Sequence, residues 1–364
     1  MIYALSIDWL SIFCLYMGAD EWTPVDSAEF SYKRENFGTR CFSQFFRVRT
    51  PNVEGGVDEF AEVQAVPYSS ILPSYAIIVR FVNRSLYLPE FWEMADRFLT
   101  VNNMSVMNIS RIDVCADFND FATISPKGLI EEFAAKRLRH IGRGVGALYF
   151  NHGLGAERDE HDRPVKDYGV SYTGLSFGTH SSAARVYLYN KSEELRTQGD
   201  KPWIRDVWRN AGLDVLHVWR LEVSIKSEGL KFKDKTTGSI VTIDVEKAYD
   251  RSELDKIFHT FVRRLFSFIK NKKDISNITR EPRIVLFDSK PAYDRGAIRN
   301  LSSGDRMERI LIKNLYQLAD KYRGSGIYEA EERSKHLAEC LAYATDLHDW
   351  LEEKKAVWEK PIHK

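Results

Sequence analysis

Polar and apolar residues alternate in short runs through the first two-thirds of the chain, and Pro, Gly or Asn bounds most runs. This pattern predicts strands over 42–50, 59–67 and 75–83. The first eighteen residues are apolar, but they have no basic leader and no small-residue cleavage site, and Asp8 and Trp9 interrupt them. They predict a buried N-terminal strand rather than a signal peptide or a membrane span.

Helical spacing appears between some of these runs. Pro89 and the apolar residues that follow it predict a helix over 88–103. The Gly-rich, charged and aperiodic segment 142–169 predicts a long loop. The remaining expected elements of this part are a strand over 107–120, a helix over 125–141, and strands over 170–178, 184–190 and 217–226.

After about residue 244 the periodicity becomes helical. A Ser-x-x-Asp capping box opens the segment 252–271, and amphipathic patterns follow over 305–324 and 329–360. The expected fold class is therefore α+β, with a central antiparallel sheet and a helical C-terminal region. We expect a domain over 1–243 and a mostly helical domain over 244–364.

The composition is that of an ordinary soluble protein, with 44% apolar residues and a formal net charge of zero. The field of the whole molecule therefore neither attracts nor repels nucleic acid, and any such binding must come from local patches. The cysteines are scattered without a CxxC pair, which indicates reduced thiols and a cytoplasmic protein. No membrane association is expected.

Three of the predicted strands carry unusual polar faces. A half-exposed antiparallel strand alternates in this way without any function, so each face alone has an ordinary explanation. Their chemical types converge, however, and if the strands are neighbours they present one patch. The three faces consist of Arg111, Asp113, Cys115 and Asp117; of Arg185, Tyr187, Tyr189 and Lys191; and of Arg220, Glu222, Ser224 and Lys226.

These residue types suit metal-assisted tyrosine chemistry. The carboxylates of Asp113, Asp117 and Glu222 are hard oxygen ligands of the kind that Mg²⁺ or Mn²⁺ prefers. A tyrosine hydroxyl has an ordinary pKa of about 10, so as a nucleophile it needs a neighbouring cation or base.

The motifs "IDWLS", "RIDVCADF", "YNKSEEL" and "VWRLEVSIK" occur in this order over roughly residues 5–230. In this they resemble the replication initiation factor family, the rolling-circle initiators of plasmids, filamentous phages and mobile elements. The resemblance implies a relaxase-like, metal-dependent nickase whose tyrosine stays attached to DNA through a 5′-phosphotyrosine. It makes Tyr189 the nucleophile, with Tyr187 as the alternative, and Lys191 and Arg220 the groups that steady the phosphate.

Two basic clusters offer contacts to DNA phosphates, although basic runs are most often solvated helix faces. The helix over 329–360 is open to ordinary packing, to homodimer formation or to contact with a host helicase. The expected DNA-binding residues are Lys136, Arg137, Arg139 and Arg143 in the first cluster, and Arg263, Arg264, Lys270, Lys272 and Lys273 in the second.

Several functions fit these features. The first is a rolling-circle initiator that binds double-stranded origin DNA and a single strand. A relaxase for element transfer uses the same chemistry, and a sequence-specific DNA-binding protein without catalysis keeps only the fold. A nuclease that activates water is a further alternative, in which no covalent adduct forms.

Overall fold

The computed structural model describes residues 1–19, 21–52, 55–68, 72–73, 75–142, 146–152, 157–158, 164–166, 170–179, 181–233, 240–272, 277–288, 293, 303–344, 347, 351–352 and 354–355. Internal contacts divide the chain into two compact units. Unit 1 comprises Met1–Ile12, Arg80–Ala95 and Asn108–Ala297, and unit 2 comprises Phe13–Val79, Asp96–Met107 and Ile298–Lys364.

The structure confirms the predicted α+β class. Ten of the described strands form one sheet in the order β2-β3-β4-β5-β1-β6-β13-β12-β11-β8, and the pairs from β6 to β8 are antiparallel. The strands are β1 (Ala4–Tyr16), β2 (Ser31–Arg34), β3 (Phe42–Pro51), β4 (Val57–Pro67), β5 (Ala76–Phe81), β6 (Met104–Phe118), β7 (Leu138–His140), β8 (Gly146–His152), β9 (Glu157–Arg158), β10 (Pro164–Lys166), β11 (Val170–Phe177), β12 (Ala184–Asn190), β13 (Trp219–Lys226), β14 (Lys231–Lys233), β15 (Ile240–Thr242) and β16 (Phe268–Lys270). The helices are α1 (Phe91–Val101), α2 (Pro126–Ala134), α3 (Lys191–Gln198), α4 (Pro202–Asn210), α5 (Val245–Tyr249), α6 (Arg251–Leu265), α7 (Ser303–Gly324) and α8 (Tyr328–Ala344).

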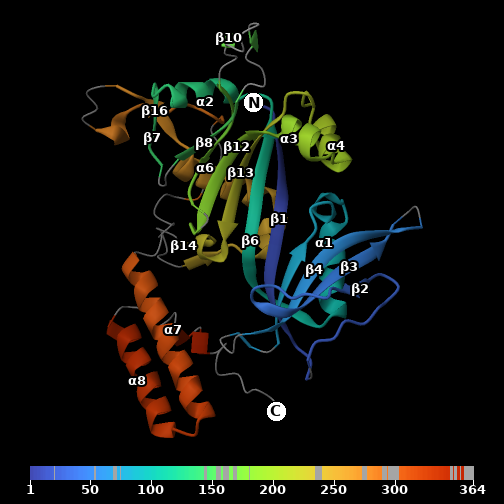
Figure 1. Cartoon of the computed structure of the whole chain (residues 1–364), viewed down its shortest axis with the longest axis vertical. Helices are drawn as coiled ribbons and strands as arrows, with labels where there is room; N and C mark the ends of the chain where they lie inside the picture. The colour runs from blue at the N-terminus through green and yellow to red at the C-terminus, as the bar shows by residue number, and fades with distance from the viewer. Residues whose placement is uncertain are drawn as a thin grey trace. The chain divides into compact units, whose positions relative to one another are not determined.

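One face of the sheet in unit 1 forms a hydrophobic core. Alternate residues of β6, β12 and β13, such as Val114, Leu188 and Val223, are fully buried there because successive side chains of a strand point to opposite faces. Helix α6 packs against β12 and β13 and lies behind them in Figure 1. With α6 on the apolar face, the polar residues of the same strands lie on the opposite face. The domain boundary at residue 243 stays a prediction.

Two predicted helices are too long. The helix expected over 125–141 ends at Ala134, since Lys136 adopts a left-handed backbone with φ of 58°, and β7 follows. The helix expected over 252–271 ends at Leu265, and β16 follows and pairs with β7. In both cases the last apolar residues, among them Leu138 and Phe268, are buried in this two-stranded ladder instead of continuing a helical face.

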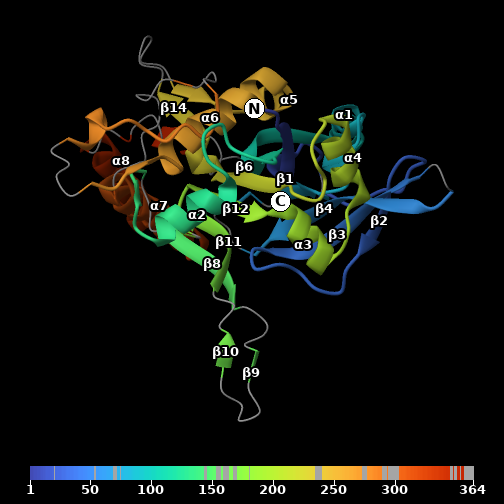
Figure 2. The ribbon, with the colours of Figure 1, turned by 90° about the horizontal axis from the view of Figure 1, so that it is seen from above.

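The prediction of a long loop over 142–169 is wrong for the described residues of this segment. Residues 146–152 form β8, which pairs with β11 along its whole length, so cross-strand pairing overrides the weak local pattern. Strands β9 and β10 form a small antiparallel ladder, which Figure 2 shows beyond the ends of β8 and β11. Helices α3 and α4, which were not predicted, begin at a side-chain cap from Asn190 and at Pro202.

Unit 2 contains an aromatic core and a helical hairpin. Phe98 of α1 packs edge-on against Phe30 and against Phe60 of β4, and all three side chains are buried. Helices α7 and α8 pack on each other through a cluster of their own that includes Ile312, Tyr316 and Ala338. In the described part of the chain, no helix is long and apolar enough to cross a membrane.

Candidate active site

The three polar strand faces predicted from the sequence lie on one face of the sheet. β6, β13 and β12 are consecutive neighbours, and residues directly opposite each other in an antiparallel pair point to the same side. The register therefore aligns three rows across the strands. They are Asp113, Ser224 and Arg185; Cys115, Glu222 and Tyr187; and Asp117, Arg220 and Tyr189.

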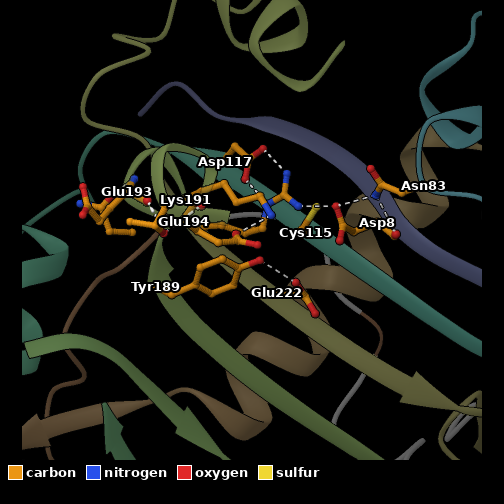
Figure 3. A network of polar contacts seen from close by, with 12 residues as sticks. Asp8, Asn83, Cys115, Asp117, Tyr189, Lys191, Glu193, Glu194 and Glu222 are labelled. Atoms are coloured by element: carbon orange, nitrogen blue, oxygen red, sulfur yellow. Dashed lines mark hydrogen bonds and ion pairs between the residues drawn. The ribbon is translucent and has the colours of Figure 1, made fainter. Parts of the chain in front are cut away.

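The hydroxyl of Tyr189 donates a hydrogen bond of 2.9 Å to Oε2 of Glu222 (Figure 3). The Tyr189 ring is half-buried between the neighbouring strands. Burial raises the pKa of the Tyr189 hydroxyl well above its ordinary value, and the negative charge of Glu222 acts in the same direction. Tyr189 is therefore a neutral phenol at physiological pH, and as a nucleophile it needs a base.

Glu222 has the protonation behaviour of such a base. Burial raises the pKa of its carboxyl to about 7, and the charges of Asp113 and Asp8 add to this rise. Near neutral pH a large share of the molecules therefore carries a Glu222 carboxylate that is still basic enough to accept a proton. A base is most effective when its pKa lies near the working pH and when it is within hydrogen-bond reach of the proton, and Glu222 meets both conditions.

Arg220 is the structural centre of the polar face. Its guanidinium is fully buried and donates two hydrogen bonds to Asp117, of 2.6 and 2.7 Å, and a further one to Asp8. The indole of Trp208 donates to the same Asp117 carboxylate at 2.7 Å. Arg220 was predicted to steady a DNA phosphate, but here it has no exposed surface with which to contact one.

Lys191 begins helix α3 directly after β12. The side chain of Asn190 accepts a hydrogen bond from the Glu193 amide, and this cap turns the strand into the helix at this point. The Lys191 ammonium is 2.6 Å from Glu194 and 5.4 Å from the centroid of the Tyr189 ring. Lys191 thus lies beside the tyrosine, but it is 1% exposed and already paired with Glu194. Its role in steadying a phosphate stays a prediction.

Tyr187, the alternative nucleophile, has a different environment. Its ring is half-buried, and the guanidinium of Arg185 lies over it at 4.9 Å from the centroid. Burial raises the pKa of its hydroxyl as well. Among the described residues, the carboxylate hydrogen bond belongs to Tyr189 and not to Tyr187.

The predicted metal ligands do not form a common set. Asp113 accepts a 2.9 Å hydrogen bond from Arg111, Asp117 is held by Arg220 and Trp208, and Glu222 is bonded to Tyr189. Over the described residues, no group of three His, Cys, Asp or Glu side chains is arranged to hold a metal ion. The three carboxylates therefore do not fit a shared divalent ion, and the requirement for Mg²⁺ or Mn²⁺ stays a prediction.

The two predicted DNA-binding clusters meet in the β7–β16 ladder. Arg139 lies opposite Ile269, and the amide of Asn271 bonds to the carbonyl of Arg137 at 2.8 Å. Arg137 pairs with Glu132, and Lys272 pairs with Glu281. Arg143 and Lys273 lie outside the described residues. The exposed cations around this ladder are Lys136, Arg137, Arg139, Arg263, Lys270 and Lys272, and Arg264 is half-buried.

The sequence did not assign a role to the groups that hold Arg220 in place. Asn83 donates to Asp8 at 3.1 Å, and the Tyr87 hydroxyl donates to the same carboxylate at 3.3 Å. The Arg220 charge, opposed by burial, holds the pKa of Asp8 below its ordinary value, so Asp8 is ionised. For Asp8 the sequence did contain a signal, because it is a charged residue inside an apolar strand. For Trp208 it contained none, because nothing in the sequence distinguishes this tryptophan from a core residue.

The fold and site define an α+β protein with a tyrosine–glutamate pair on the polar face of an antiparallel sheet. No family model matches the chain, and no curated protein matches it. The solved structures that are similar to it include the "Structure of Rolling Circle Replication Initiator Protein from Geobacillus stearothermophilus". That likeness has 17% identity and a TM-score of 0.43, and it covers 77% of this chain and 92% of the other. A likeness of this extent assigns no residue roles.

Proposed function

We propose that this protein is a rolling-circle DNA replication initiator that nicks one strand of its origin with Tyr189. The observation that carries the proposal is the 2.9 Å hydrogen bond from the Tyr189 hydroxyl to Glu222, whose pKa is about 7. This bond supports the proposal, because a carboxylate of near-neutral pKa can take up the phenol proton as the tyrosine attacks.

The reaction is a displacement at phosphorus. The Tyr189 oxygen attacks a DNA phosphodiester while its proton passes to Oε2 of Glu222. A bond forms between the phenolic oxygen and phosphorus, and the bond from phosphorus to the 3′ oxygen breaks. The 3′ oxygen takes up a proton from solvent, and the 5′ end stays on the enzyme as a phosphotyrosine. Because this ester conserves the energy of the broken bond, a 3′ hydroxyl can reverse the reaction without ATP.

The β7–β16 ladder supplies the surface that we assign to duplex DNA. Exposed lysines and arginines from two distant segments of the chain gather on this ladder, whereas the chain as a whole has zero net charge. Such a local concentration of cations attracts the phosphate backbone without reading its sequence. A helicase partner and a homodimer remain predictions.

A relaxase for element transfer uses the same site and the same chemistry. Its distinction from a replication initiator lies in the DNA that is processed, not in the residues. The initiator and the relaxase both form a covalent adduct with DNA. A non-catalytic DNA-binding protein and a nuclease that activates water do not.

The proposal is tested with supercoiled circles that carry the genomic segment around the coding sequence, incubated with Mg²⁺ or Mn²⁺. We expect relaxed circles and a protein–DNA adduct on a denaturing gel. Tyr189→Phe removes the nucleophile and abolishes both, and Tyr187→Phe is the matched control that retains them.

Relaxed circles without an adduct, unchanged in Tyr189→Phe, would indicate a nuclease that uses water. A mobility shift without cleavage would indicate a pure DNA-binding protein. The same reaction in a chelator tests the predicted metal.

A further inference from the structure

Small residues separate the tyrosines of the polar face. On β11, Gly174 lies between Tyr189 of β12 and Tyr149 of β8, and Ser176 lies between Tyr187 and Ala147 in the next row. The floor between β8 and β12 is therefore low, because glycine, serine and alanine have short side chains or none. The residues on either side of this floor are aromatic, with Tyr149 on β8 and Tyr187 and Tyr189 on β12.

The ring of Tyr149 lies across this floor. Its hydroxyl forms a 3.1 Å hydrogen bond with Oγ of Ser176, and its Cδ2 is 3.5 Å from the position that a Cβ on Gly174 would take. The hydrogen bond fixes the hydroxyl end of the ring to β11, and the absence of a side chain at Gly174 lets the other end lie close to the strand. Tyr149 is nevertheless 47% exposed, so part of the ring remains accessible from solvent.

Cations flank the tyrosines on the same face. The Arg185 guanidinium lies over the Tyr187 ring. Arg111 lies on the same polar face of β6, where its 32%-exposed side chain pairs with Asp113. A flat, exposed aromatic ring offers a stacking surface to a base of any sequence, and Arg185 adds positive charge beside it for the backbone. Bases in a duplex are already stacked on each other, so this arrangement suits an unpaired strand.

We propose that Tyr149 and Tyr187, over the floor of Gly174 and Ser176, form a stacking strip for the unpaired bases beside the phosphate that Tyr189 attacks. The proposal rests on the proposed function, because that function supplies the single strand. Tyr149 is the main stacking residue, since it is the more exposed of the two rings. Neither ring takes part in the chemical step.

The test measures binding of a fluorescent oligothymidylate by full-length protein that carries Tyr189→Phe, so that no adduct forms. Adding Tyr149→Leu removes the ring and weakens binding about ten-fold, in line with the energy of one base stacked on an aromatic side chain. Tyr149→Phe keeps the ring and binds like the parent protein. Tyr328→Leu is the matched control, because Tyr328 is 69% exposed but lies in α8, and it also binds like the parent.

A second probe separates stacking from charge. An abasic oligonucleotide of the same length offers the backbone alone, so it binds the parent more weakly and is insensitive to Tyr149→Leu. The proposal is overturned if Tyr149→Leu binds oligothymidylate like the parent. It is also overturned if the substitution weakens the binding of both oligonucleotides by the same factor. If Tyr149→Leu weakens oligothymidylate binding while the protein with Tyr189 intact forms no adduct with origin DNA, the strip is upheld and the tyrosine chemistry is refuted.

Discussion

The Tyr189–Glu222 pair predicts how nicking depends on pH. Burial raises the pKa of Glu222 to about 7, and only its carboxylate form accepts the phenol proton. The single-turnover nicking rate should therefore increase as the pH rises through about 7 and level off above it. Rates measured from acid to mildly alkaline buffers check this. A flat profile through neutral pH would exclude Glu222 as the base.

Replacing Glu222 by Gln should separate activity from stability. The folded protein holds the Glu222 proton more tightly than the unfolded chain, since the pKa is raised from 4.5 to about 7. Stability is therefore lost as the pH rises through this range. Glu222→Gln cannot ionise and so avoids that loss. Its melting temperature should therefore exceed that of wild type above about pH 7 but not below about pH 4. The same substitution removes the base and should abolish nicking. An equal or lower melting temperature in alkali would contradict the role of burial.

Arg220 should matter for folding more than for phosphate binding. Its side chain is fully buried between Asp8 and Asp117, and removal leaves two carboxylates without their cation. Arg220→Ala should lower the free energy of unfolding by about 3–5 kcal/mol. Urea unfolding measures this loss. Arg205→Ala, which removes an arginine from a partly exposed pair with Asp200, is the control and should cost under about 1 kcal/mol.

At the residue scale, the sequence predicted the polar face but not its pairings. Side-chain alternation determines which face a residue points to, so Asp113, Glu222 and Tyr189 could be placed together once their strands were taken as neighbours. The partner of each charge depends on register and on residues distant in sequence. Asp117 was therefore assigned to a metal, while in the fold it accepts hydrogen bonds from Arg220 and Trp208.

At the scale of elements, strand periodicity was predictive and helix ends were not. The strands over 184–190 and 217–226 appear as β12 and β13 with nearly the same bounds. β7 and β16 were read as the ends of helices, because three-residue strands leave almost no periodic signal. Their pairing joins segments about 130 residues apart and is specified only by the folded core.

The β7–β16 ladder predicts the salt dependence of DNA binding. Arg139 and Lys270 are exposed on adjacent strands of the ladder. If each contacts one phosphate, Arg139→Ala and Lys270→Ala should each weaken duplex binding and reduce the slope of log affinity against log salt by about 1. Titrations across a range of salt measure the slope. Lys127→Ala, an exposed cation on α2, is the control and should leave it unchanged. An unaltered slope in both ladder variants would place the DNA elsewhere.

At the scale of the whole molecule, the residues of the candidate active site belong to one unit. Asp8, Asn83, Tyr87, Asp117 and the residues of β12 and β13 fall within unit 1, whereas α7 and α8 fall within unit 2. The buried side chains of the hairpin pack on each other in a cluster of their own. A chain that ends at residue 302 should therefore fold and still form the covalent adduct. Loss of adduct in a folded truncated protein would show that the C-terminal helices take part in nicking.

The identity of the attached residue tests the central claim most directly. Wild-type protein is allowed to react with a suicide oligonucleotide whose upstream fragment is short and leaves with its 3′ hydroxyl. The adduct with the downstream fragment is then digested and sequenced by mass spectrometry. The geometry predicts a 5′-phosphodeoxynucleotide on Tyr189, in the peptide that also contains Tyr187. Attachment to Tyr187 or to any other residue, or cleavage without attachment, would contradict it.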